Sequence, residues 1–418
     1  MSARSGQALR RLEPWALWLV FLTIHAVQAH WNLTSDTNPF ADVTVVYRDW
    51  TEQARNGSVP GIDEPFVYPL LAILPMLATA AIEDASGSHL SYGAAWMLLI
   101  TAGHAAAFAA LAFARPDAPQ APGRRRAAWW WLAFLAVLGP VATGRIDAVA
   151  APIAILALLL LRRHPAACGV LLAIGAWVKV WPAALLAALL VASRRRLRLF
   201  AAASGTGLAV LLGALLLGAG ANALSFVSGQ TGRGLQVEAP SALVPMWHAA
   251  LGTPGYRAGY DREILTVQVT GPGTEAIAFW TTPAMGLAVL LLVLLGLLRR
   301  RGGASFTSLA PVLSLGLVTA LVVSNKVGSP QFVTWIGATV AIGLVWSPRG
   351  FAVPAGLTLA IAAATCWIYP WNYPHVMTPT VLGVTVLTIR NLLELALFSW
   401  CLWALLRPLL STRTAFGS

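Results

Sequence analysis

Long hydrophobic runs separated by short polar breaks extend over most of the chain. Many of these runs can cross about 30 Å of hydrocarbon as an α-helix, which satisfies its own backbone hydrogen bonds in lipid. The pattern predicts one all-α domain over residues 1–418, a polytopic membrane bundle of about twelve transmembrane helices. The candidate spans are 14–30, 66–83, 90–114, 127–142, 146–161, 166–179, 181–193, 199–219, 276–298, 305–324, 331–346, 351–369 and 384–406.

Composition supports the membrane assignment. Of the 418 residues, 58% are hydrophobic and 11% are charged, and the mean hydropathy is +0.71. Soluble domains carry about 25% charged residues. The abundance of Ala, Gly and Arg with very little Lys is typical of a high-GC bacterium, so we expect a multi-pass protein of the bacterial plasma membrane.

The net charge of +12 comes from arginines that cluster at helix ends. By the positive-inside rule these ends are cytoplasmic. No basic stripe with interleaved aromatic residues is present, so we expect no nucleic-acid partner. The clusters are Arg10–Arg11, Arg124–Arg126, Arg162–Arg163, Arg194–Arg198 and Arg299–Arg301.

Two long polar loops, residues 31–65 and 220–275, then fall on the extracytoplasmic side, where we expect short interfacial helices. The basic residues around 166–193 predict a hairpin of two short helices with both ends in the cytoplasm. If the clusters Arg124–Arg126 and Arg162–Arg163 are also cytoplasmic, the candidate spans before residue 200 include one crossing too many. Either 66–83 is not a full crossing, or the 166–193 pair is one kinked helix.

The first loop concentrates carboxylates. It contains Asp36, Asp42, Asp49, Glu52, Asp63 and Glu64, out of sixteen acidic residues in the chain. Asp42 opens an amphipathic segment that could lie at the interface, where a carboxylate could act as a general base. The alternative is that all of these are ordinary solvated loop residues.

Lysine occurs only as Lys179 and Lys326, and neither lies in a cytoplasmic cluster. Each follows or interrupts an apolar run, where a charge is costly without a partner. A bound phosphate is one such partner; snorkelling or an internal carboxylate is the other. Arg145 could likewise bind an anion or pair with Asp147, and the spacing of Arg390 and Glu394 favours a structural ion pair.

The remaining polar residues give weaker signals. His104 is expected inside the bundle, while His248 and His375 lie in outer loops and could contact a polar ligand. Trp247 and Trp371 could stack on a sugar or anchor the chain at the interface. The three cysteines fall in apolar stretches and no zinc-like Cys/His spacing occurs, so no metal site and no cofactor is predicted.

A collinear set of motifs resembles the polytopic glycosyltransferases of the C type, and within them the actinobacterial polyprenol-phosphate-mannose-dependent α-mannosyltransferases. The matching segments are Asp42-Val-Thr-Val-Val-Tyr47, Pro65-Phe-Val-Tyr-Pro69, Gly144-Arg-Ile-Asp147, Lys179-Val-Trp-Pro182, Arg233-Gly-Leu-Gln-Val-Glu238 and Lys326-Val-Gly-Ser-Pro-Gln-Phe332.

The resemblance implies transfer of a sugar, with mannose expected, from a polyprenyl phosphate to a glycolipid or lipoglycan acceptor at the outer face. Asp42 occupies the position of the general base, with Asp49 as its rival. The donor phosphate would bind Lys326, Lys179, Arg145 and Arg233. The substrate cleft would include Tyr47, Asp49, Tyr68, Glu238, His248, Gln331, Tyr373 and His375.

Such a transfer would proceed by a single displacement with inversion, which needs one base and a phosphate leaving group but no metal ion. Two alternatives remain open at this point. The donor could carry arabinofuranose, since the same phosphate and tail would be recognised. The chain could instead be a lipid or solute transporter, although no internal repeat is visible.

Overall fold

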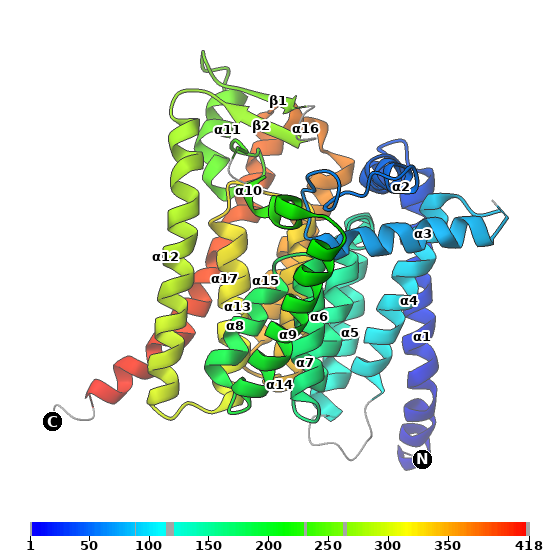
Figure 1. The fold of residues 1–418 in the computed structure, drawn as a ribbon. Coiled ribbons are helices and arrows are strands. Elements are labelled where there is room, and N and C mark those ends of the chain that lie inside the picture. The colour runs from blue at the N-terminus through cyan, green and yellow to red at the C-terminus, as the bar shows by residue number, and fades with distance from the viewer. Residues whose placement is uncertain (1, 88, 114–120, 230–231, 262–265, 415–418) are drawn as a thin grey trace.

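The computed structural model describes residues 2–87, 89–113, 121–229, 232–261 and 266–414, which form an upright bundle of helices. In Figure 1 both ends of the chain point to the same end of the bundle, and the two long polar loops gather at the other. We call these the basic end and the loop end. The helical membrane bundle predicted from the sequence is confirmed.

Six helices in the described part of the chain are long and apolar enough to cross a membrane. They are α4 (Tyr92–Ala112), α9 (Arg196–Leu216), α12 (Thr274–Arg301), α13 (Phe306–Val323), α15 (Ala352–Cys366) with its extension η7 (Trp367–Trp371), and α17 (Val381–Thr414). Two further helices, α1 (Ser2–Thr34) and α5 (Ala121–Leu138), run beside them. The expected number of about twelve crossings is therefore not confirmed.

Four apolar helices are shorter: α6 (Asp147–Leu160), α7 (Pro165–Val178), α8 (Pro182–Ala192) and α14 (Val333–Trp346). Helices of 11 and 14 residues extend about 16 and 21 Å, less than the hydrocarbon thickness of about 30 Å. Their loop-end termini carry the polar motifs of the sequence. Irregular backbone at such depth is tolerated only where protein encloses it.

Helices α7 and α8 form the hairpin that the sequence predicted. The Arg195 guanidinium donates a hydrogen bond to the Arg162 carbonyl, which joins the two basic ends. The Lys179–Trp181 tip points the other way. The centre of the bundle is α13 and α14, whose side chains are almost all buried.

Residues 66–83 do not form an upright helix of the bundle. They form the 3₁₀ turn η2 (Leu70–Ala72) and α3 (Ile73–Ala85), which lies across the upright helices at the loop end (Figure 1). This resolves the surplus crossing in favour of the first of the two readings.

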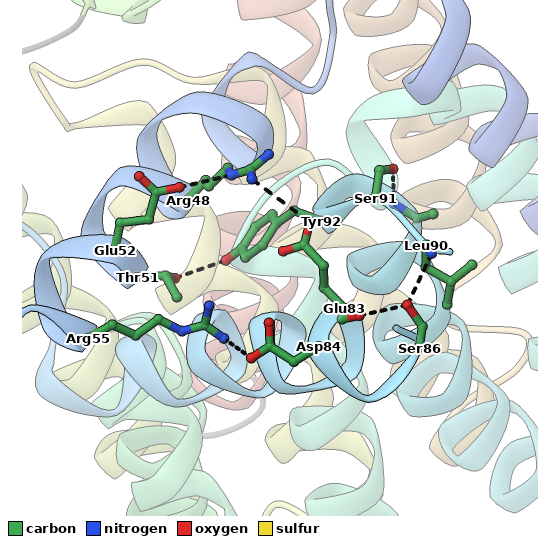
Figure 2. A network of polar contacts seen from close by, with 11 residues as sticks. Arg48, Thr51, Glu52, Arg55, Glu83, Asp84, Ser86, Leu90, Ser91 and Tyr92 are labelled. Atoms are coloured by element: carbon green, nitrogen blue, oxygen red, sulfur yellow. Dashed lines mark hydrogen bonds and ion pairs between the residues drawn. The ribbon is translucent and has the colours of Figure 1, made fainter. Parts of the chain in front are cut away.

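The first loop folds into the π-helical turn η1 (Asp42–Tyr47) and α2 (Arg48–Arg55). Ion pairs hold helix α3 against this loop. Figure 2 shows the contacts: Arg48 with Glu52 at 3.1 Å and with Glu83 at 4.0 Å, the ion pair of Arg55 with Asp84, and the Thr51 and Tyr92 hydroxyls 3.2 Å apart.

The second loop contains η4 (Gly220–Leu224), α10 (Ser225–Ser228), η5 (Pro240–Ala242), α11 (Leu243–Ala250) and an antiparallel hairpin of β1 (Arg257–Asp261) and β2 (Thr266–Thr270). Arg257 pairs with Thr270 and Asp261 with Thr266. The sequence reading expected only helices here. Alternation in Thr266-Val-Gln-Val-Thr270, which buries Val267 and Val269, was the missed signal of a strand.

Three short turns complete the loop end: η3 (Gly139–Ala142), η6 (Pro330–Phe332) and α16 (Pro374–Met377). The turn before η6 packs against the second loop. The Gln236 N–H donates to the Lys326 carbonyl at 3.0 Å, and a Cβ on Gly328 would lie 2.2 Å from the Ala239 nitrogen. Only glycine therefore permits this approach.

Candidate active site

The link from Thr143 to Asp147, between η3 and α6, is held by side chains from three other elements. Trp96 Nε1 donates to the Thr143 carbonyl at 2.9 Å, and Asn32 donates to the Thr143 hydroxyl at 3.0 Å. The Ile146 N–H donates to the Tyr47 hydroxyl at 3.0 Å. The bonds with Trp96 and Tyr47 satisfy buried backbone groups of the link that lie outside any helix. They fix the two charged side chains that the link carries, Arg145 and Asp147.

Arg145 reaches from this link to the first loop. Its Nε lies 3.0 Å from Asp42 Oδ2, and its Nη1 donates to the carbonyls of Pro39 at 2.9 Å and Gly144 at 3.0 Å. Its Nη2 donates to the Tyr369 hydroxyl at 2.6 Å. The Arg145 side chain is 7% exposed, whereas that of Asp42 is 37% exposed.

The two acidic rivals of the first loop differ in their surroundings. Asp42 faces Arg145 at the base of the loop. Asp49, seven residues further on, is exposed and accepts a hydrogen bond from Gln53 of the same helix at 2.7 Å. Of the two, only Asp42 contacts Arg145, another residue of the predicted site.

Asp147 points away from Arg145. The two therefore do not form the ion pair that was one of the two alternatives for Arg145. Asp147 is 1% exposed and accepts a hydrogen bond from Trp335 Nε1 at 2.5 Å. The Lys179 Nζ lies 3.8 Å from Asp147 Oδ2 and 4.3 Å from the centre of the Tyr68 ring. The ammonium thus has an internal carboxylate and an aromatic face as partners.

Arg233 and Lys326 come together at a cavity of about 990 Å³ at the loop end. Residues of β2 and the first turns of α12 also line it, among them Gln268, Thr270, Glu275 and Phe279. Burial, and secondarily the charge of Arg233, lowers the pKa of Lys326, while burial lowers that of Arg233. Both shifts indicate that burial disfavours positive charge at this cavity.

Tyr68 stands between the two groups of charges. The Lys179 ammonium lies over its ring, and the ring packs edge-on against that of Tyr47 with the ring centres 6.2 Å apart. Tyr68 also partly offsets the effect of burial, which lowers the pKa of Arg233. Burial, with Tyr68 and Asp42 adding to it, raises the pKa of Tyr47 well above its usual value. Tyr47 therefore acts as a neutral hydroxyl.

Glu238 and Tyr373 do not line this cavity, and the Glu238 side chain is buried. Glu238 Oε2 lies 2.8 Å from Arg390 Nη1, with each side chain 2% exposed, and Arg390 Nη2 donates to the Glu238 carbonyl at 2.5 Å. Burial raises the pKa of Glu238, opposed by Arg390 and by a hydrogen bond from Tyr373. The expected Arg390–Glu394 pair is present but longer, at 3.9 Å. Arg390, a residue of α17, therefore holds the second loop against this helix mainly through Glu238.

The other predicted cleft residues have local partners. Gln331 is buried in η6, at 7% exposure. His248 stacks on Tyr256 with ring centres 4.6 Å apart, and His375 Nδ1 lies 3.2 Å from the Thr380 hydroxyl. Of the candidate sugar-stacking residues, Trp247 donates to Thr388 at 3.0 Å and Trp371 packs edge-on against Trp31 at 5.6 Å. None of these contacts joins them to Asp42.

Sequence reasoning missed Tyr369, Trp335 and the carbonyl of Pro39. Tyr369 lies in the aromatic and proline-rich stretch Trp367-Ile-Tyr-Pro-Trp371, where extended backbone at Tyr369 (φ −121°, ψ 127°) interrupts the helix. Trp371 of this stretch was expected to stack on a sugar or to anchor the chain at the interface, and no role was expected for Tyr369. Its polar use could not be seen, because Tyr369 and Arg145 are far apart in sequence.

The fold and the site together define a class: a helical membrane protein whose loop end carries a partly exposed aspartate, Asp42, and a cavity lined by Arg233 and Lys326. In the described residues, no group of three or more His, Cys, Asp or Glu side chains could hold a metal ion. The polar groups that the site brings together are the Asp42 carboxylate, the arginine and lysine cations, and tyrosine hydroxyls.

Comparison with known families gives the particular class of enzyme. The sequence model of glycosyltransferase family 87 matches residues 66–256, a little under half of the chain. The protein is accordingly a glycosyltransferase, and the matched region contains Tyr68, Arg145, Lys179 and Arg233. No curated protein and no solved structure matches the chain.

Proposed function

We propose that the protein transfers a sugar, with mannose as the expected one, from a polyprenyl phosphate to a glycolipid or lipoglycan acceptor at the extracytoplasmic face of a bacterial plasma membrane. The observation that carries this proposal is the presence, at the loop end, of both Asp42 and a cavity lined by Arg233 and Lys326. Arginines at the opposite end support the extracytoplasmic placement.

The two cations of the cavity suit a donor phosphate. Burial lowers the pKa of both side chains, and a bound phosphate would favour their charged forms. The cavity is bordered by Phe279 of α12, a side chain that is 68% exposed on a membrane-spanning helix. A polyprenyl tail could therefore remain in the lipid while its phosphate binds. Lys179, already paired with Asp147, would contribute at longer range.

Asp42 is the proposed general base. One carboxylate oxygen takes the proton of the acceptor hydroxyl while the hydroxyl oxygen forms a bond to the anomeric carbon. The bond from that carbon to the phosphate oxygen breaks on the opposite face, and polyprenyl phosphate leaves with its negative charge stabilised by Arg233 and Lys326. One base and one displacement invert the anomeric configuration.

Purified protein in nanodiscs should extend a lipid-linked mannoside when supplied with polyprenyl-phosphate mannose. Asp42→Asn should lower the rate by at least about 100-fold, since general base catalysis contributes about 10²–10⁴-fold. Asp49→Asn decides between the rivals: loss of activity there, with activity retained in Asp42→Asn, would move the base to Asp49.

The donor is tested in the same assay with polyprenyl-phosphate arabinofuranose. Turnover with that donor and none with the mannosyl donor would replace mannose by arabinofuranose. The match to a glycosyltransferase family favours an enzyme over the transporter alternative. Transbilayer movement of the lipid without any glycosylated product would contradict the proposed reaction.

A further inference from the structure

We propose that Arg145 is a positioning residue for Asp42, aligned by Tyr369, and not a ligand of the donor phosphate as the sequence suggests. The proposal rests on the proposed role of Asp42 as the base. It also assigns a role to Tyr369, a residue that the sequence alone does not single out.

The hydrogen bonds of the guanidinium argue against a phosphate-binding role. Arg145 has five N–H groups. Two donate to the carbonyls of Pro39 and Gly144 and one donates to the Tyr369 hydroxyl. The Nε atom lies 3.0 Å from Asp42 Oδ2 in an ion pair. A phosphate-binding arginine offers two parallel N–H groups to the anion. Because Nη1 already makes two hydrogen bonds and the Nε side faces Asp42, Arg145, at 7% exposure, has no such pair to offer.

Tyr369 holds the other side of the guanidinium. Its hydroxyl accepts from Arg145 Nη2 at 2.6 Å and donates to the Pro39 carbonyl at 3.3 Å. The Pro39 carbonyl therefore receives both Arg145 and Tyr369, three residues before Asp42. The Arg145 Cζ also lies 5.3 Å from the centre of the Tyr369 ring. Both the direction of the guanidinium and the start of the first loop are fixed by one tyrosine.

This arrangement leaves the carboxylate ready for an acceptor. Arg145 contacts Oδ2 of Asp42, and no hydrogen bond to Oδ1 occurs among the described residues. Oδ1 can therefore receive the proton of an incoming hydroxyl. Burial acts to lower the pKa of Arg145, but Asp42 and Tyr369 outweigh it and raise the pKa, so the guanidinium keeps its protons and only orients the base.

Steady-state kinetics separate positioning from phosphate binding. In Tyr369→Phe we expect kcat to fall about tenfold, and in Arg145→Lys about 100-fold, as for a misplaced catalytic group. The KM for the polyprenyl-phosphate donor should stay within about twofold of the parent. Arg145→Gln should be slower than Arg145→Lys, because lysine keeps the charge opposite Asp42.

Two comparison variants calibrate the result. Arg233→Gln, in the cation-lined cavity, should raise the donor KM. Tyr92→Phe removes a buried structural hydroxyl that donates to the Met76 carbonyl at 3.1 Å, and should lower the melting temperature with kcat unchanged. A loss of kcat in Tyr369→Phe without loss of folded protein then reports on the site and not on stability.

The opposite pattern overturns the proposal: donor KM raised several-fold in Arg145→Lys with kcat preserved would make Arg145 a phosphate ligand. Parental kinetics in both Arg145→Lys and Tyr369→Phe would also overturn the proposal. Failure of the base assignment is distinguishable, because it appears as activity in Asp42→Asn whatever Arg145 and Tyr369 do.

Discussion

The buried ion pair between Glu238 and Arg390 should control how firmly the second loop is held on the bundle. Each side chain is 2% exposed and the closest atoms are 2.8 Å apart. Removing one partner of a buried pair costs about 3–5 kcal/mol, because the other charge is left uncompensated. In Glu238→Ala, Arg390 keeps Asn391 and the more distant Glu394, so we expect the lower end, about 3 kcal/mol.

A cost of that size should be measured as local opening of the loop. At about 1.4 kcal/mol per factor of ten, the open population should rise about 100-fold. Cleavage of the second loop by added protease in nanodiscs tracks this population when opening is fast. Donor KM should rise as well, because the same loop carries Arg233.

The matched control is an exposed pair. Arg48 and Glu52 are 3.1 Å apart with side chains 50% and 58% exposed, and such a pair contributes about 0.2–1 kcal/mol. Glu52→Ala should therefore change cleavage of the first loop less than about fivefold. If Glu238→Ala accelerated cleavage of the second loop by no more than this, the argument from burial would be refuted.

The same pair predicts a pH dependence. Because the pKa of Glu238 is raised in the folded protein, its protonated form is favoured by folding. The stabilisation is present below the unfolded pKa and is lost as the pH rises through the folded pKa. Cleavage of the parent loop should slow from about pH 8 to about pH 5. Glu238→Gln, which cannot titrate, should lack this change; an equal change in both would exclude Glu238 as its source.

Two further predictions concern the turn that meets the second loop. Lys326→Met should raise the melting temperature of the donor-free protein, because the lowered pKa of Lys326 reports a charge that burial and Arg233 disfavour; the donor KM should rise. A lower melting temperature would contradict this. Gly328→Ala should lower activity and stability, because its Cβ would lie 2.2 Å from the Ala239 nitrogen; parental values for both would show that the approach relaxes at no cost.

Local sequence signals predicted most of the bundle because membrane burial leaves few alternatives. Apolar runs located the upright helices, and arginines at both ends of 166–193 predicted the α7–α8 hairpin. The exceptions have physical causes. Residues 66–83 are apolar enough to cross, but α3 lies flat where the first loop can pair with it through Glu83 and Asp84. Hydropathy alone carries no information about such pairing.

The site was predicted unevenly for a related reason. Chemistry-bearing residue types stand out in an apolar chain, so Asp42, Arg145, Lys179, Arg233 and Lys326 could all be selected as candidates. Their grouping could not be predicted. Whether Arg145 meets Asp42 or Asp147 depends on the direction in which a five-residue link leaves η3, and that direction is set by distant hydrogen bonds from α1, α4 and η1.

By itself, then, the sequence determined a helical membrane protein with its arginine clusters at one end and most of its carboxylates and both lysines at the other. Hydrophobic transfer and the cost of charge in lipid depend on residue type and local order, so they can be read along the chain. Only the tertiary structure decided the partners: Arg145 with Asp42 and Tyr369, Lys179 with Asp147, and Arg233 with Lys326. Those pairings depend on distances of a few ångströms between segments that may be hundreds of residues apart.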